Sequence, residues 1–330
     1  MKNIGILGSG TWGTALANCL TNIGHEVTVW TKFEKEKEVL EQTHIHPNLP
    51  GVELNKNIVF TTCLSSAVKD KEIVIFATPS IFIRETAIAV KAYLNPSQII
   101  VTVAKGIEEK TFFTMTEILE DVLGKEYSIT ALSGPTHAEE VSRGIPSTIV
   151  SAGTDLNACK IVQKAFEGTP LRVYTNNDVL GVEICGALKN IIALATGISD
   201  GLGFGDNTRA AIITRGLAEI TRLGLSVGCK IETFIGLAGV GDLVVTATSR
   251  HSRNSRAGYL LGQGHSLEDT LKEVGMVVEG INALPAAKNL AEKNNVDIPI
   301  IDAVYDVVNN KRNPKEIVLS LLSREQKQEN

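Results

Sequence analysis

The 330-residue sequence lacks the patterns by which cysteine and histidine bind structural metals or build disulfide frameworks. Its five cysteines are scattered and include no C-x-x-C pair, which is typical of reduced thiols in the cytoplasm. The six histidines offer only His44-Ile45-His46 as a close pair, and this spacing fits a loop better than a metal site. We therefore expect a cytoplasmic protein without a metal ion.

A membrane-targeting segment and an excess of basic residues are also missing. No signal peptide fits before the strand expected from residue 3. The longest apolar run, residues 179–198, contains Glu183, Lys189 and Asn190, which would be costly in lipid, so it predicts a core helix and no stable membrane insertion. The formal net charge of −5 argues against nucleic acid or an anionic membrane surface as the main partner.

The sequence has enough apolar residues, 43% of the total, to form two domains with full cores. Up to residue 175, β-branched runs alternate with helical stretches, which indicates a parallel sheet buried on both faces. The expected strands are residues 4–7, 25–30, 57–60, 72–77, 98–104, 127–132, 147–152 and 171–174. Later segments have helical length and spacing, namely residues 179–198, 209–223, 267–273 and 281–294. The predicted fold class is α/β, with a Rossmann-type domain over residues 1–178 and an all-helical domain over residues 179–330.

The most informative motif is the glycine-rich turn Gly8-Ser9-Gly10-Thr11-Trp12-Gly13, which separates the first strand from an apolar helix. In this motif Gly8 permits a tight turn and Gly10 lets backbone N–H groups approach a pyrophosphate. Gly13 lets the helix pack closely on its strand. An ordinary tight loop could have the same residues, but the strand before it and the helix after it favour a dinucleotide site.

Two lysines follow predicted strands at the edge where such sheets bind ligands. An NAD-specific site usually has an acidic residue after the second strand, whereas this chain has Lys32 there and no carboxylate before Glu34. We therefore expect NADPH to be accepted at least as well as NADH, unless Glu34 turns back to the ribose. Lys105, which precedes Gly106, could reach a substrate or the cofactor, or it could be a solvated loop lysine.

Lys189 is the strongest candidate for catalysis, because its neighbours over residues 182–195 are almost all apolar or small. Desolvation lowers the pKa of a lysine from about 10.4 toward the roughly 7–8 that suits a general base. The alternative is a lysine that extends from a core helix to the surface. Asp242 could pair with Lys189 or only cap a helix. Glu183 and Asn190, on one face of the same helix, could orient neighbouring groups or be core polar residues.

The run from Ser249 to Arg256 contains three arginines among hydroxyl and amide side chains. These groups suit the recognition of a phosphate. A solvated basic loop would have a similar composition.

Taken in order, these motifs resemble the bacterial-type NAD(P)-dependent glycerol-3-phosphate dehydrogenase family from Lys2 to beyond Glu279. The segments that carry the resemblance are residues 8–16, 104–106, 133–136, 189–190, 199–205, 214–219, 239–243 and 252–254.

The resemblance implies interconversion of dihydroxyacetone phosphate and sn-glycerol 3-phosphate with NADPH or NADH, mainly as reduction, to supply phospholipid synthesis. It also implies a homodimer and a proton exchange between Lys189 and the C2 oxygen of the substrate. The implied substrate-binding residues are Lys105, Gly134, Thr136, Lys189, Asp242, Ser252, Arg253 and Asn254. The cofactor-binding set, with the glycine turn and Lys32 included, is Gly8, Gly10, Thr11, Trp12, Gly13, Lys32, Lys105, Ala138, Arg253, Val277 and Glu279.

Two other functions remain open at this point. A related 3-hydroxyacid or ketopantoate-type dehydrogenase would need a clamp for a carboxylate, which the run at residues 252–254 does not exclude. A non-catalytic dinucleotide sensor could have kept the same fold, although the presence of Lys105, Lys189 and Asp242 together argues against it.

Overall fold

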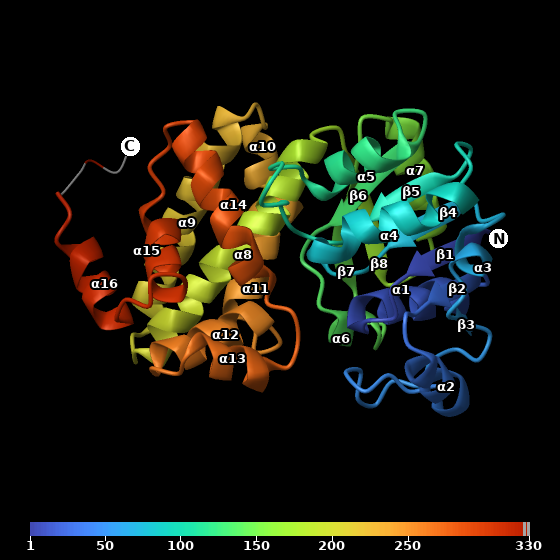
Figure 1. The fold of residues 1–330 in the computed structure, drawn as a ribbon, viewed down its shortest axis with the longest axis horizontal. Helices are drawn as coiled ribbons and strands as arrows, with labels where there is room; N and C mark the ends of the chain where they lie inside the picture. The colour runs from blue at the N-terminus through green and yellow to red at the C-terminus, as the bar shows by residue number, and fades with distance from the viewer. Residues whose placement is uncertain (326–327, 329–330) are drawn as a thin grey trace. The chain divides into compact units, whose positions relative to one another are not determined.

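The computed structural model describes residues 1–325 and 328, and the chain forms two compact units (Figure 1). The first unit consists of residues 1–106 and 113–183, and the second of residues 107–112 and 184–330. The division falls inside the long helix α8 (Val179–Gly201). The sequence pattern had placed the boundary before this helix, where the strands end.

The first unit is built on a single sheet of eight strands in the order β3-β2-β1-β4-β5-β6-β7-β8. The strands are β1 (Asn3–Leu7), β2 (Glu26–Trp30), β3 (Val59–Thr61), β4 (Ile73–Phe76), β5 (Ile99–Thr102), β6 (Ser128–Ser133), β7 (Ser147–Ala152) and β8 (Leu171–Asn176). Neighbouring strands are parallel except β6 and β7, which are antiparallel. The predicted Rossmann-type fold with a mainly parallel sheet is confirmed, and the β6–β7 pair is an antiparallel exception that the sequence did not indicate.

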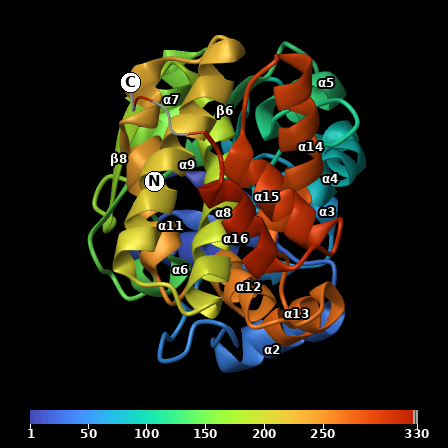
Figure 2. The ribbon, with the colours of Figure 1, turned by 90° about the vertical axis from the view of Figure 1, so that its left-hand side faces the viewer.

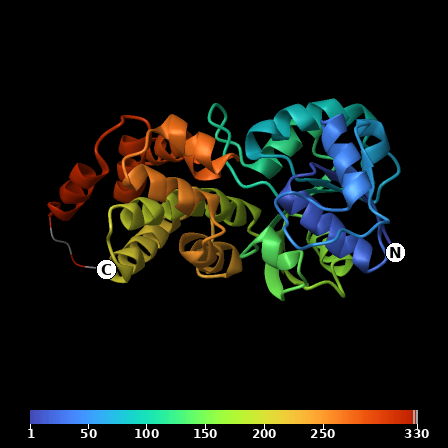
Figure 3. The same ribbon diagram turned by 90° about the horizontal axis from the view of Figure 1, so that it is seen from below.

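Helices cover both faces of this sheet (Figure 3). They are α1 (Thr11–Asn22), α2 (Glu34–Thr43), α3 (Leu64–Val68), α4 (Ile83–Val90), α5 (Met115–Leu123), α6 (Ala138–Val141) and α7 (Leu156–Ala165), with short 3₁₀ turns η1 (Ser80–Phe82) and η2 (Lys91–Tyr93).

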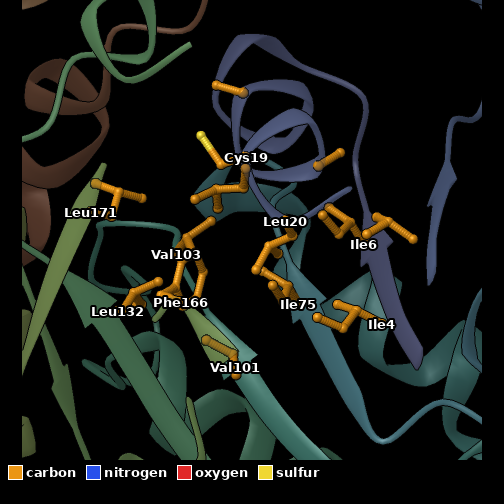
Figure 4. Close-up of a cluster of buried hydrophobic side chains, with 14 of the residues drawn as sticks. Ile4, Ile6, Cys19, Leu20, Ile75, Val101, Val103, Leu132, Phe166 and Leu171 are labelled. Atoms are coloured by element: carbon orange, nitrogen blue, oxygen red, sulfur yellow. The ribbon is translucent and has the colours of Figure 1, made fainter. Parts of the chain in front are cut away.

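Alternate residues of the central strands enter two separate cores. Ile73 and Ile75 of β4 belong to the cluster that includes α1, whereas Val74 and Phe76 belong to the cluster on the opposite face. Figure 4 shows the first cluster, in which Ile4 and Ile6 of β1 lie beside Leu20 of α1. A strand with apolar residues on both faces must be buried on both sides, as the sequence predicted.

The regular elements of the second unit, over its described residues, are all helices (Figure 2). After α8 it contains α9 (Asp206–Ser226), α10 (Ile231–Phe234), a π-helical turn η3 (Leu237–Gly241), α11 (Asp242–Thr248), α12 (Arg253–Gly262), α13 (Leu267–Val274), α14 (Glu279–Lys293), α15 (Pro299–Val308) and α16 (Pro314–Leu322). The helices predicted over residues 209–223, 267–273 and 281–294 are confirmed within three residues at their ends.

Two helical segments are long and apolar enough by composition to cross a membrane, Val179–Gly201 and Ile231–Thr248. In the first, 89% of the most apolar 18-residue window is buried inside the protein, as expected for a core helix. The second is 44% buried by the same measure and is divided into α10, η3 and α11.

Glycines let α8 and α12 pack with their backbones in contact. A Cβ on Gly197 of α8 would lie 2.1 Å from the carbonyl oxygen of Ser255, and one on Gly258 of α12 would lie 2.1 Å from that of Leu194. Neither position has room for a side chain. The close approach brings the N-terminal end of α12 next to the polar residues in the middle of α8.

Candidate active site

The glycine-rich turn between β1 and α1 has the geometry that its sequence predicts. Gly8 has φ +124°, and a Cβ there would lie 2.8 Å from the carbonyl of Ala77. A Cβ on Gly13 would lie 2.1 Å from the carbonyl oxygen of Gly8, so only glycine allows α1 to pack this closely. Around Gly10, in contrast, a Cβ would meet nothing within 4 Å, which leaves space for a ligand to approach the backbone.

The N-terminus of α1 suits an anion such as the pyrophosphate of a dinucleotide. Its N-cap is Gly10, which provides no side-chain cap, and its first turn contains no acidic residue. The backbone N–H groups and the helix dipole are therefore not neutralised by the helix's own side chains. In the described part of the chain, the buried hydroxyls of Thr11 and Thr78, which follow β1 and β4, have no hydrogen-bond partner. These observations fit a dinucleotide cofactor.

Lys32 and Glu34 follow β2, but the carboxylate of Glu34 forms hydrogen bonds with residues other than Lys32. It accepts hydrogen bonds from Lys37 Nζ at 2.9 Å and from Thr62 Oγ1 at 2.8 Å, and both contacts lower its pKa. The side chain of Lys32 is 66% exposed and lies 3.7 Å from Glu85. This arrangement leaves the ammonium of Lys32 able to meet a phosphate.

Several predicted site residues lie along one edge of the sheet. Because β1, β4, β5 and β6 are parallel neighbours, the segments that follow them share this edge. Lys105 Nζ, after β5, donates to the carbonyl oxygen of Gly134, after β6, at 3.3 Å. Thr136 Oγ1 donates to the same oxygen at 3.2 Å. Ala138 is buried at the start of α6.

In the second unit, Lys189 points into the core and not to the surface. Its Nζ lies 2.6 Å from Asp242 Oδ1, and the two side chains are only 5% and 2% exposed. Asp242 is the first residue of α11, so the alternative that it merely caps a helix does not account for its contacts. The buried carboxylate stabilises the charged ammonium, which opposes the effect of desolvation expected from the sequence.

Thr246 completes this group and was not predicted from the sequence. Its Oγ1 accepts a hydrogen bond from Lys189 Nζ and donates one to the backbone carbonyl of Asp242 at 2.6 Å. Thr246 lies four residues after Asp242, so one helix face carries both groups. That spacing was a signal in the sequence that could have identified it. The π-helical turn η3 precedes Asp242 directly, and such turns are frequent at functional sites.

The predicted phosphate-binding run forms the N-terminus of α12. Ser252 is its N-cap and accepts a hydrogen bond from the backbone N–H of Ser255 at 3.2 Å. Asn254 is buried; its Nδ2 donates to Asn190 Oδ1 at 3.0 Å, and its Oδ1 accepts from the N–H of Gly280 at 2.9 Å. Asn254 therefore connects α12 to α8 and to the start of α14.

Arg253 is exposed and donates to the carbonyl oxygen of Val277 at 3.1 Å. Glu279 begins α14 two residues later. The structure thus brings Arg253 into contact with Val277, one of the two predicted cofactor residues of this segment. Of the neighbouring arginines, Arg256 pairs with Glu273 at 3.4 Å.

The side chains of Glu183 and Asn190 form hydrogen bonds with different groups and not with each other. Glu183 accepts hydrogen bonds from the Thr114 hydroxyl at 2.7 Å and from the Thr116 backbone N–H at 2.9 Å, so it holds the N-terminus of α5. Burial raises the pKa of its carboxyl to about 7. Asn190 is bound to Asn254 and to the carbonyl of Gly186.

No disulfide joins any of the five cysteines, all of which lie within the described residues. Over residues 1–325 and 328, no group of three or more histidine, cysteine, aspartate or glutamate side chains is arranged to hold a metal ion. The absence of a metal from the protein's chemistry stays a prediction.

Two family models match the chain over most of its length. Residues 3–159 match the N-terminal region of NAD-dependent glycerol-3-phosphate dehydrogenase, and residues 178–319 match its C-terminal region. The chain is 54% identical to glycerol-3-phosphate dehydrogenase [NAD(P)+] 2 of Lactobacillus delbrueckii subsp. bulgaricus, over 100% of this chain and 99% of the relative.

Solved structures agree with these matches. The crystal structure of glycerol-3-phosphate dehydrogenase from Coxiella burnetii superposes with a TM-score of 0.94 at 34% identity, covering 98% of this chain and 99% of that one. A ketopantoate reductase from Ralstonia eutropha has a TM-score of 0.66 at 16% identity, over 96% of this chain and 99% of that one, which shows a shared fold only. The chain belongs to the NAD-dependent glycerol-3-phosphate dehydrogenase family.

Proposed function

We propose that this protein interconverts dihydroxyacetone phosphate and sn-glycerol 3-phosphate, using NADPH or NADH and their oxidised forms. The observation that carries the proposal is the buried group formed by Lys189, Asp242 and Thr246. A protonated lysine, held by one carboxylate and one hydroxyl, can supply a proton to a carbonyl oxygen and later remove it. Such a group has no evident purpose in a protein that only binds a dinucleotide.

Lys189 is the proton donor in the reducing direction and the base in the oxidising direction. The bound nicotinamide supplies or accepts the hydride at C2 of the substrate. Asp242 keeps the ammonium of Lys189 charged before the proton is given to the C2 oxygen. Thr246 fixes the position of Nζ, because its hydroxyl is itself anchored to the backbone of Asp242. Pre-organisation of this kind lowers the entropic cost of reaching the reactive geometry.

Arg253 binds the phosphate group of the substrate. Its guanidinium offers a planar set of donors that matches phosphate oxygens, and its exposure leaves donors beyond the one given to Val277. Ser252 and Asn254 flank it, and their side-chain hydrogen bonds hold the site together: Ser252 caps α12 and Asn254 connects three helices. The family resemblance also assigns Lys105, Gly134 and Thr136 to substrate binding.

The first unit binds the dinucleotide and the second provides the catalytic group. The pyrophosphate is bound at the turn of Gly8, Gly10 and Gly13 with Thr11 and Trp12, and Lys32 meets a 2′-phosphate when NADPH is used. Lys105, Ala138, Arg253, Val277 and Glu279 complete the cofactor contacts. We expect a cytoplasmic homodimer that supplies glycerol 3-phosphate for phospholipid synthesis, as the family resemblance implies.

The experiment that tests this function follows the oxidation of NADPH and of NADH with three carbonyl substrates. We expect turnover with dihydroxyacetone phosphate and far less with ketopantoate or with unphosphorylated dihydroxyacetone. Preference for ketopantoate would assign the site to a carboxylate substrate. Cofactor binding without turnover of any of the three would indicate a dinucleotide sensor.

A further inference from the structure

The segment between α2 and β3, residues 44–58, has no regular helix or strand of its own but is packed firmly against α1. Leu49 and Leu54 are buried in the same core as the apolar face of α1. At the end of the segment, the backbone N–H of Asn55 donates to Asn18 Oδ1 of α1 at 2.8 Å. The segment is thus fixed to the helix whose N-terminus forms the glycine turn.

His46 is the point at which this segment meets the glycine turn. The residue is only 3% exposed. Nδ1 accepts a hydrogen bond from the backbone N–H of Asn48 at 3.1 Å, so in the neutral ring the proton is on Nε2. Nε2 lies 3.1 Å from the carbonyl oxygen of Ser9 and donates to it. Burial lowers the pKa of His46, against an opposing effect of the Glu36 carboxylate.

The Ser9 carbonyl therefore has two donors on the protein side. Besides His46, the buried hydroxyl of Thr14 donates to it at 2.8 Å. In a trans peptide the carbonyl and the following N–H point in opposite directions. With the Ser9 carbonyl held toward His46 and Thr14, the N–H of Gly10 is directed the other way. A Cβ on Gly10 would meet nothing within 4 Å, so the Gly10 backbone borders open space.

We propose that His46 is a positioning residue for cofactor binding, which sets the orientation of the Ser9–Gly10 peptide so that its N–H faces the pyrophosphate of the dinucleotide. The proposal rests on the function proposed above. A histidine with both ring nitrogens engaged between two backbone groups holds this peptide more rigidly than a solvated loop could. Part of the ordering of the turn is then complete before the cofactor arrives.

Two conservative variants separate the two hydrogen bonds of the ring. In His46→Asn, the side-chain oxygen can replace Nδ1 as acceptor for Asn48, but no donor reaches Ser9. In His46→Gln, the amide nitrogen can replace Nε2 as donor to Ser9. We expect His46→Asn to raise the Kd for NADPH about tenfold, the effect of one well-placed hydrogen bond. His46→Gln should recover most of the affinity, and kcat at saturating cofactor should change less than about twofold in both variants.

The measurement is direct titration of NADPH fluorescence without substrate, with His44→Asn as the matched control. His44 is in the same segment, has left-handed backbone (φ 51°) that asparagine tolerates, and uses its backbone carbonyl for the N–H of Leu54. A Kd for His46→Asn equal to that of the control, or equal losses in the Asn and Gln variants, would overturn the proposal. So would a fall in kcat with unchanged Kd.

A spectroscopic measurement on the unaltered protein tests the same idea if His46→Asn fails to fold. Long-range proton–nitrogen NMR should show the Nε2–H tautomer of His46 with and without NADPH, and the Nδ1–H tautomer would contradict the proposal. The function itself is tested separately. If the unaltered protein binds NADPH but turns over no dihydroxyacetone phosphate, the proposed function fails while the role of His46 stands.

Discussion

Lys189 Nζ lies 2.6 Å from Asp242 Oδ1 in an environment that leaves 5% of the lysine side chain and 2% of the aspartate side chain exposed. At this depth, removal of one charge leaves the other buried and uncompensated. The pair therefore does more than neutralise a lysine in a core helix. It keeps an ammonium ready to donate a proton where water cannot compete.

A change of Asp242 to Asn tests the role of the carboxylate. We expect a loss of at least about 100-fold in kcat for reduction of dihydroxyacetone phosphate, because the charged form of Lys189 loses its counter-ion. The alkaline limb of the pH–rate profile should also move to lower pH, since the ammonium is given up more readily. Steady-state kinetics between pH 6 and 10 measure both effects. An unchanged profile would mean that Asp242 acts only as a structural residue.

A change of Arg253 to Ala should affect the phosphorylated substrate selectively. We expect kcat/KM for dihydroxyacetone phosphate to fall by a factor equivalent to several kcal/mol of transition-state stabilisation, because a charge-assisted contact that orients the substrate is lost. Activity on unphosphorylated dihydroxyacetone should change much less. Arg250→Ala, in the same run of residues, is the control. Equal losses on the two substrates would mean that Arg253 acts on the cofactor or on the fold, and the phosphate site must then lie elsewhere.

Lys32 should determine how well NADPH is used. Because Glu34 is engaged by Lys37 and Thr62, we expect kcat/KM with NADPH to be at least equal to that with NADH. Lys32→Ala should weaken NADPH use about tenfold or more with little effect on NADH. Lys35→Ala, at an exposed position in α2, is the matched control. If the unaltered protein uses NADPH more than about tenfold less well than NADH, a difference of ~1.4 kcal/mol, our interpretation of Lys32 is wrong.

Glu183 should make stability depend on pH. Its pKa is raised from 4.5 to about 7 in the folded protein, so between these values the folded state binds more protons than the unfolded state. The free energy of unfolding must therefore fall as pH rises from 4.5 to 7, by up to roughly 3 kcal/mol from this group.

The side chain of Glu183→Gln cannot ionise, so the variant does not lose this contribution as pH rises. We therefore expect its free energy of unfolding, relative to that of the unaltered protein, to increase between pH 4.5 and 7. Urea unfolding at several pH values measures it, with Glu120→Gln, exposed on the same helix α5 that Glu183 holds, as the control. A difference that does not vary between pH 4.5 and 7 would show that the Glu183 carboxyl titrates normally.

The spacing of apolar residues predicted the parts of the fold in which a residue's position along its own strand or helix decides whether it is buried. The apolar strands and the long core helix are of this kind, because β-branched runs and helical spacing describe burial directly. The reversed direction of β7 could not be predicted. It depends on how the chain returns after β6 with only the short helix α6 in the connection, and strand composition does not record direction.

The candidate site shows the same limit. The glycine turn was predictable because each glycine has its own reason: positive φ at Gly8, close packing at Gly13 and open space for a ligand at Gly10. The pairing of Lys189 with Asp242 could only be suggested, since the two residues lie on different helices and are 53 positions apart in the sequence. Thr246 and Asn254 act through partners on other helices. His46 was expected to lie in an ordinary loop, and its contact with Ser9 requires a tertiary fold that spacing cannot show.

The most direct test of the account is the reduction of dihydroxyacetone phosphate by Lys189→Ala, measured together with the Kd for NADPH. The account predicts a fall of more than ~100-fold in kcat, the lower end of typical general acid–base contributions, with cofactor affinity nearly unchanged because the glycine turn is intact. Lys272→Ala, at an exposed position in α13, should behave like the unaltered protein. A kcat near the unaltered value in Lys189→Ala would contradict the assignment of Lys189 as the proton donor.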